Sequence, residues 1–76
     1  MSPAIQYDIH VFKTNIDTET DSQIVGEVLN THEDVMHWSV DLNDVDRVLR
    51  IVTCSLHQSD IISLINQQGY QCSELQ

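Results

Sequence analysis

Two segments with the apolar spacing of an amphipathic helix alternate with four segments that have the composition of strands. The helices are predicted at about residues 19–31 and 57–68. Their apolar stripes consist of Ile24, Val25, Val28 and Leu29 in the first helix and of Ile61, Ile62, Leu64 and Ile65 in the second. The strands are predicted at residues 5–14, 35–42, 47–54 and 70–75. The element order is therefore β-α-β-β-α-β.

This order restricts the fold more than any single motif does. Two right-handed crossovers on one antiparallel sheet produce a ferredoxin-like arrangement. The predicted fold class is α+β, a βαββαβ sandwich in which two helices cover one face of a four-stranded antiparallel sheet. A chain of 76 residues leaves room for one hydrophobic core. We therefore expect residues 1–76 to form a single domain.

The apolar residues of the first two predicted strands are distributed differently. In the second strand they alternate, which predicts one apolar face made of Met36, Trp38, Val40 and Leu42. The first strand has Ile5, Tyr7, Ile9 and Val11 on one face, while its other face carries Phe12 and His10. Because helices cover only one face of such a sheet, Tyr7, Ile9 and Val11 form a candidate interaction surface for a protein partner or a homodimer. The alternative is ordinary, scattered surface apolarity.

The charge of the chain excludes several classes of partner. Twelve acidic and three basic residues give a formal net charge of −9. Such a chain repels nucleic acid, whose binding requires clustered Lys and Arg, and it repels anionic membrane surfaces for the same reason.

No apolar run approaches the roughly 20 residues that span a bilayer. The start of the chain lacks the pattern of a secretory signal, so a cytoplasmic location is expected.

The residues at the predicted helix ends are suited to capping. Thr18 and Thr20 are both N-cap candidates for the first helix, and Thr20 is followed three residues later by Gln23, as in a capping box. Ser55 is the predicted cap of the second helix. Gly69 is placed to end that helix.

Three further groups of residues are informative when taken together. They are Phe12–Ile16, Trp38–Leu42 followed by Asp46–Leu49, and Ile61–Tyr70. Together they resemble the heavy-metal-associated domain of copper chaperones and metal-transporting ATPases. The resemblance implies the ferredoxin-like fold, and it implies a CxxC pair that binds Cu(I) or another soft ion where the first loop meets the first helix. This chain has Thr18 and Asp21 at those two positions. Hydroxyl and carboxylate oxygens do not favour soft ions, so no metal cofactor is predicted at this loop.

Other residues offer alternative metal ligands. Carboxylates at Asp17, Glu19 and Asp21 look like the start of a calcium loop, but the turn glycine and the final Glu of such a loop are missing. A transition metal ion held by relocated ligands remains the alternative, with the candidates His10, His37, His57, Cys54 and Cys72.

Two hypotheses for the function follow from these residues. The chain has no Gly-rich phosphate loop, nucleophile elbow or Ser-His-Asp pattern, so no catalytic residues are predicted and an enzyme is not expected. The first hypothesis is a small, non-catalytic interaction domain on a heavy-metal-associated scaffold that lacks the thiolate site. The alternative is a metal-binding or metal-chaperone protein that uses the relocated His and Cys ligands.

Overall fold

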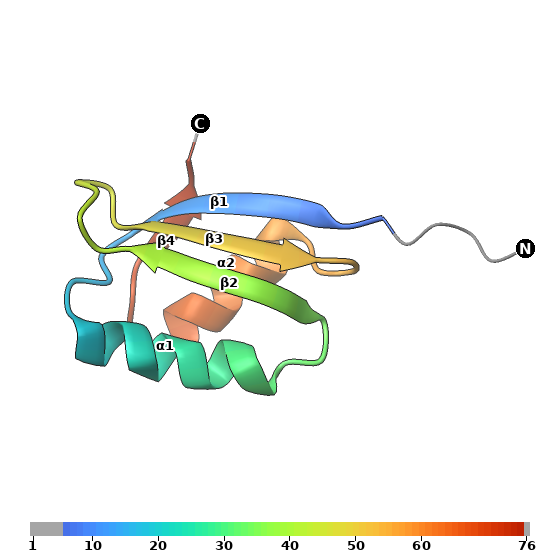
Figure 1. Ribbon diagram of the computed structural model, residues 1–76, viewed down its shortest axis with the longest axis horizontal. Coiled ribbons are helices and arrows are strands. Elements are labelled where there is room, and N and C mark those ends of the chain that lie inside the picture. The colour runs from blue at the N-terminus through green and yellow to red at the C-terminus, as the bar shows by residue number, and fades with distance from the viewer. Residues whose placement is uncertain (1–5, 76) are drawn as a thin grey trace, which may run out of the picture.

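Six elements follow one another in the predicted order (Figure 1). The computed structural model describes residues 6–75. The elements are β1 (Asp8–Thr14), α1 (Glu19–Thr31), β2 (Val35–Asp41), β3 (Val48–Thr53), α2 (Gln58–Gln67) and β4 (Cys72–Glu74). The strands form one sheet in the order β2-β3-β1-β4, and every neighbouring pair is antiparallel. The predicted ferredoxin-like α+β fold is therefore confirmed.

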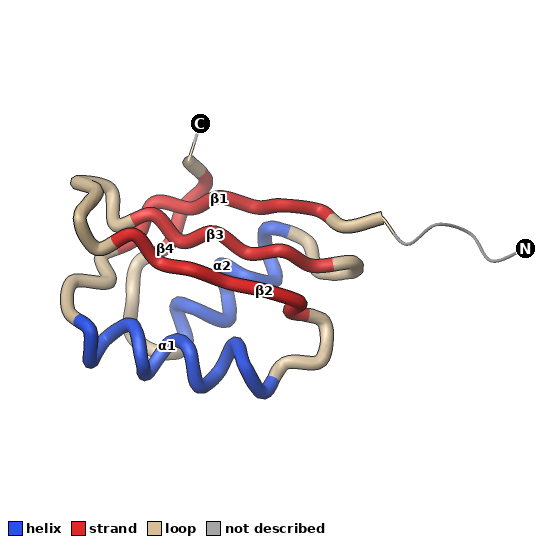
Figure 2. Tube along the Cα trace, viewed as in Figure 1, coloured by secondary structure: helices blue, strands red, loops and turns tan. Residues whose placement is uncertain are grey.

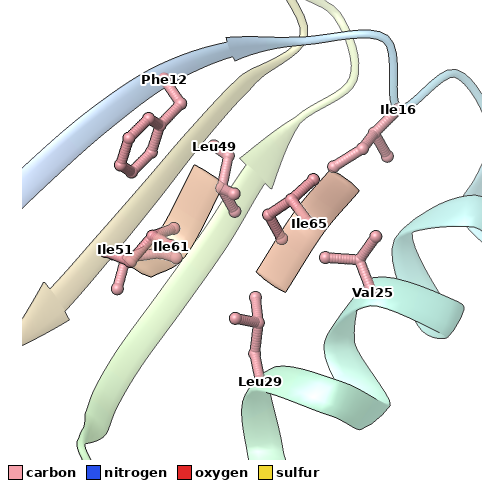
Figure 3. Close-up of a cluster of buried hydrophobic side chains, with 8 residues drawn as sticks. All are labelled: Phe12, Ile16, Val25, Leu29, Leu49, Ile51, Ile61 and Ile65. Atoms are coloured by element: carbon pink, nitrogen blue, oxygen red, sulfur yellow. The ribbon is translucent and has the colours of Figure 1, made fainter. Parts of the chain in front are cut away.

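The hydrophobic core lies between the sheet and the two helices, which cover the same side of it (Figures 1 and 2). Eight apolar side chains from both helices, two strands and one loop are fully buried there (Figure 3). They are Phe12, Ile16, Val25, Leu29, Leu49, Ile51, Ile61 and Ile65. Burial of one such side chain contributes roughly 1.5–3 kcal/mol, so this cluster is the main source of stability. The face of β1 that carries Phe12 is thus the core face.

Helix α1 begins where the sequence predicted, at a cap that was one of two candidates. The Thr18 hydroxyl accepts a hydrogen bond from the Asp21 N–H at 3.1 Å, and the Asp21 carboxylate accepts one from the Thr18 N–H at 3.2 Å. Thr18 and Asp21 are thus the two halves of a capping box. The prediction of a capping box that begins at Thr20 is wrong, because Thr20 lies inside the first turn of the helix.

The N-cap of helix α2 lies two residues later than predicted. The N-cap is His57, whose N–H donates to the Asp60 carboxylate at 3.0 Å. Ser55 does not cap the helix, because its N–H and that of Leu56 donate to the buried Thr53 hydroxyl and turn the chain before the helix starts. At the other end Gly69 has a φ of 92°, a left-handed conformation that favours glycine and ends the helix as predicted.

Strand β2 differs from the simple alternation that the sequence predicted. The pairing with β3 shifts between Val35 and His37, which inserts one extra residue into β2. Val35 and Trp38 both pack against the core, so Met36 is displaced to the opposite face, where it is 51% exposed. Met36 therefore does not share a face with Trp38, Val40 and Leu42, and that part of the prediction is wrong.

The terminal strands are shorter than predicted. The first strand was predicted from residue 5, but Ile5 lies outside the described residues and β1 begins at Asp8. Strand β4 begins at Cys72 rather than residue 70, because Tyr70 and Gln71 make hydrogen bonds to Asp21 and Asn15, at the junction between β1 and α1. Neither described helix is long and apolar enough to cross a membrane.

Candidate functional site

The loop that joins β1 to α1, residues 15–18, is organised around the Asp21 carboxylate. One carboxylate oxygen accepts hydrogen bonds from the N–H groups of Thr18 at 3.2 Å and Asp17 at 3.4 Å. The other oxygen accepts a hydrogen bond from the Tyr70 hydroxyl at 2.7 Å. Both oxygens of Asp21 are therefore engaged by groups of the protein itself.

These hydrogen bonds act on the charge state of both partners. The Tyr70 hydroxyl, followed by the Thr18 side chain, lowers the pKa of Asp21 below its ordinary value of 3.8. The negative carboxylate in turn raises the pKa of Tyr70 above 10.0, because the phenol is stabilised as a proton donor. At neutral pH Asp21 is thus ionised and Tyr70 is protonated, which is the state that the hydrogen bond requires.

A second set of contacts holds the loop to the β2–β3 turn. The Arg47 guanidinium forms an ion pair with Asp17 at 2.9 Å and also donates to the Leu42 carbonyl. The Thr14 hydroxyl donates to the Arg47 carbonyl at 2.5 Å and accepts from the Ile16 N–H at 3.2 Å. The Asp17 side chain is largely exposed, so the ion pair contributes little by itself and the buried Thr14 contacts set the position of the loop.

The loop is also tied to the segment that follows α2. The Asn15 side-chain oxygen accepts a hydrogen bond from the Gln71 N–H at 2.8 Å, next to the contact between Tyr70 and Asp21. Two neighbouring residues of this segment therefore hold the first residue of the loop, Asn15, and the first turn of α1, at Asp21. Tyr70, Asn15 and Arg47 were not predicted as site residues, because their side-chain contacts with Asp21, Gln71 and Asp17 span large separations in the sequence.

The residues at this loop do not fit a soft metal ion. Thr18 and Asp21 occupy the two positions at which the resemblance implied thiolates, and each supplies only hard oxygen atoms. The Thr18 oxygen already accepts the Asp21 N–H, and the Asp21 oxygens accept three donors. Binding an ion here would break the hydrogen bonds that start α1.

The two cysteines lie at opposite ends of the sheet. Thr53, the neighbour of Cys54, pairs with Asp8 on β1, whereas Cys72 pairs with Thr14. Six residue steps along β1 separate these pairings, which corresponds to roughly 20 Å at about 3.3 Å per residue. Cys54 is exposed, and burial raises the pKa of the half-buried Cys72 thiol to about 11. The two thiols cannot bind one metal ion together.

The structure brings two of the candidate histidines to the same cavity. His10 and His57 line a cavity of about 440 Å³ next to Asp8 and Glu74. The His10 Nε2 atom lies 3.1 Å from the Leu56 carbonyl oxygen, within hydrogen-bonding distance. His37 lies on the other face of the sheet, paired with Val52. Within residues 6–75, no group of three or more His, Cys, Asp and Glu side chains is arranged to hold a metal ion.

Two of the candidate interaction residues, Ile9 and Val11, lie on the face of the sheet that the helices leave uncovered. The side chains of β1 alternate, and because Phe12 and Thr14 are buried, Ile9 and Val11 point to the opposite face. Ile9 is 52% exposed and Val11 is half-buried, while Tyr7, just before β1, is 54% exposed.

Comparisons with known proteins identify the fold through structure alone. No family model matches the chain, and no curated protein matches it by sequence. Oxidized MerP from Ralstonia metallidurans CH34 matches with a TM-score of 0.78 and 12% identity, over 93% of this chain and 100% of that chain. The yeast copper transporter domain Ccc2a, solved in the apo and Cu(I)-loaded states, matches with a TM-score of 0.76 and 13% identity, over 90% and 94%. The apo HMA domain of the copper chaperone for superoxide dismutase matches with a TM-score of 0.75 and 17% identity, over 100% and 76%.

These structures share an architecture with the present chain. The fold is therefore that of heavy-metal-associated, copper-chaperone-like domains, as the resemblance in the sequence implied. At such low identities the likeness extends to the fold and no further. The only cysteines of this chain are Cys54 and Cys72, so the scaffold has no CxxC pair.

Proposed function

We propose that this protein is a small, non-catalytic interaction domain on a heavy-metal-associated scaffold, and that it carries no soft metal ion at the loop between β1 and α1. The observation that carries the proposal is the Asp21 carboxylate, whose oxygens accept hydrogen bonds from Asp17, Thr18 and Tyr70. When the side chain at a ligand position already accepts hydrogen bonds from the protein itself, a role in folding is favoured over a role in metal exchange. A protein in the cytoplasm is the partner that we propose, rather than nucleic acid or a membrane.

The alternative function is metal handling through relocated ligands. It is favoured by one observation, the cavity that His10 and His57 share with Asp8 and Glu74. The Cu(I)-loaded state belongs to the yeast Ccc2a domain, and we extend metal handling to this chain only as the hypothesis to be tested.

Metal titration separates the two functions. Purified apo protein is titrated with Cu(I), Zn(II) and Ni(II) against competing chelators of known affinity, together with Cys54→Ser/Cys72→Ser and His10→Ala/His57→Ala variants. We expect no binding tighter than tens of micromolar for any of the three ions, because no described cluster offers three ligands. Stoichiometric sub-micromolar binding that either double variant abolishes would contradict the proposal and establish the alternative.

A gain-of-binding variant tests the loop itself. Thr18→Cys/Asp21→Cys places two thiols three residues apart at the start of α1. We expect this variant to bind Cu(I) far more tightly than the natural chain, because thiolates are the ligands that soft ions prefer. Circular dichroism verifies its folding, since the substitutions also remove the capping box. If the natural chain bound Cu(I) as tightly as this variant, Thr18 and Asp21 would be no obstacle to binding.

A further inference from the structure

The uncovered face of the sheet carries a continuous apolar cluster. Ile9 on β1 pairs with Val52 on β3, which in turn pairs with His37 on β2, next to the displaced Met36. Tyr7 precedes the same end of β1. Among the described residues, five large apolar side chains are exposed, and three of them, Tyr7, Ile9 and Met36, gather at this end of the face. We call Tyr7, Ile9, Met36 and Val52 the open-face cluster.

The fold, rather than chance scatter, produces this cluster. Both helices cover the other side of the sheet (Figure 1), so alternation along β1 and β3 leaves one apolar row without a packing partner. The extra residue in β2 adds Met36 to that row. Contiguous apolar surface of this kind is typical of interaction sites.

Negative charge is concentrated away from this face. Three strand residues are acidic, and the register places Asp8 and Glu74 on the helix-covered side, opposite Thr53 and Phe12. Of these three strand residues, Asp41, opposite Val48, is the one on the open face. The other nine acidic residues belong to the helices and the loops.

The open face itself carries charges of both signs. Arg50 points to it, opposite Val11 and Ser39, and forms no ion pair with any residue in the range 6–75. Lys13 lies farther along the same face of β1 and reaches Asp46 at its rim, at 3.7 Å. The face thus provides an unpaired cation, Arg50, and an acid, Asp41, so two such faces are complementary in charge.

From this distribution of apolar residues and charges we propose that the open-face cluster docks a second copy of this chain, in a twofold dimer whose two sheets face each other. A net charge of −9 makes two copies repel each other over most of their surface, and the open face is where that repulsion is weakest. A twofold contact uses the same patch on both copies and closes without further association. The proposal names the partner within the interaction role proposed above, on which it rests.

The test is the oligomeric state as a function of protein concentration, measured by sedimentation equilibrium. We compare the natural chain with Ile9→Glu and with Val45→Glu, a matched control at a turn residue that is 91% exposed. We expect a monomer–dimer equilibrium in the natural chain and in Val45→Glu. Ile9→Glu should weaken dimerisation at least about tenfold, because it buries a charge in the contact.

Two further measurements test the dimer. Added salt should strengthen the dimer, since it screens the repulsion between two acidic chains while the apolar contact remains. NMR shift changes with concentration should map to the open-face cluster and to Arg50. A monomer at every concentration up to roughly millimolar, equal association of the two Glu variants, or shift changes confined to the helices or to the β2 edge would overturn the proposal.

These outcomes are independent of the metal titration. A chain that binds no metal and stays monomeric, yet associates with a different protein through this face, would overturn the dimer and leave the interaction role intact. A chain that dimerises and also binds Cu(I) with sub-micromolar affinity would contradict the proposed function and leave the dimer intact.

Discussion

Asp21 lies three residues after the N-cap of α1, and its single carboxylate performs two tasks. It completes the capping box with Thr18, which is a local task within one turn of helix. It also accepts the Tyr70 hydroxyl from 49 residues away, which joins the start of α1 to the segment after α2. A thiolate at this position would be available for metal exchange, whereas the Asp21 carboxylate is part of the framework.

Tyr70→Phe tests this contact. The pKa of Asp21 is lowered in the folded protein, so its contribution to stability is present above the ordinary carboxyl pKa and is lost as the pH falls through the lowered value. Because the Tyr70 hydroxyl is the largest cause of the shift, we expect the variant to have an Asp21 pKa closer to 3.8. Its loss of stability should be largest at neutral pH and should shrink once acid protonates Asp21.

The measurements for Tyr70→Phe are an NMR titration of the Asp21 carboxyl carbon and urea unfolding from neutral to acidic pH. Tyr7→Phe is the matched control, since Tyr7 is 54% exposed and precedes β1, at the opposite end of that strand from the loop that leads to Asp21. An Asp21 titration that is identical in Tyr70→Phe and the natural chain would show that the hydroxyl has no effect on the carboxylate in solution.

At the scale of elements, the packing of α1 on β2 depends on one glycine. A Cβ atom added at Gly26 would overlap Cζ2 of Trp38 and lie 2.7 Å from its Cη2 atom. The same indole donates a hydrogen bond from Nε1 to the Asn30 side chain at 2.8 Å, which fixes the ring over the helix. Gly26 therefore permits a close approach that helix propensity alone would disfavour.

Gly26→Ala has two opposing effects on stability. Alanine improves helix propensity by about 1 kcal/mol, but the overlap with Trp38 should cost about 1–3 kcal/mol. We expect net destabilisation, measured by urea unfolding, together with a shift in the Trp38 fluorescence. Gly26→Ala/Trp38→Phe should recover the propensity gain relative to Trp38→Phe alone, because phenylalanine lacks the overlapping atoms. A Gly26→Ala variant more stable than the natural chain would mean that the helix and the indole separate at little cost.

At the scale of the whole molecule, the sheet register separates the two cysteines. In native conditions we expect an excess of a thiol reagent to modify one cysteine per chain, Cys54, because Cys72 is half-buried with a pKa of about 11. Both should react in urea. Cys54→Ser should abolish the fast native reaction, whereas Cys72→Ser should leave it unchanged. Equally fast native reaction of both thiols would mean that β4 detaches readily from β1.

Much of the fold could be predicted because its signals are local. The bounds of α1 agree with the predicted range 19–31, since the apolar spacing lies within the helix and its cap residue lies directly beside it. The shift in β2 at Met36 could not be predicted from alternation, because it depends on how β2 pairs with β3. The late start of β4 likewise depends on the contacts of Tyr70 and Gln71 with residues more than 48 positions away.

For the candidate site, the sequence predicted only that the thiolates are missing. Thr18 and Asp21 were recognised as substitutes for the implied thiolates, because the donor chemistry of a side chain is a property of its residue type. Three features could be seen only in the folded chain. Cys54 and Cys72 are far apart, His10 and His57 line one cavity, and Tyr70 contacts Asp21.

The sequence by itself determined the element order, the position of α1, the excess of negative charge and the lack of thiolates at the first loop. These features depend on residue type and on spacing within a few turns of chain. Only the tertiary structure decided which groups donate hydrogen bonds to Asp21 and which candidate metal ligands lie too far apart to share an ion. It also decided that Tyr7, Ile9 and Met36 stay exposed. Those outcomes follow from strand register and from helices that pack on one side of the sheet, and both bring together residues that are distant in the sequence.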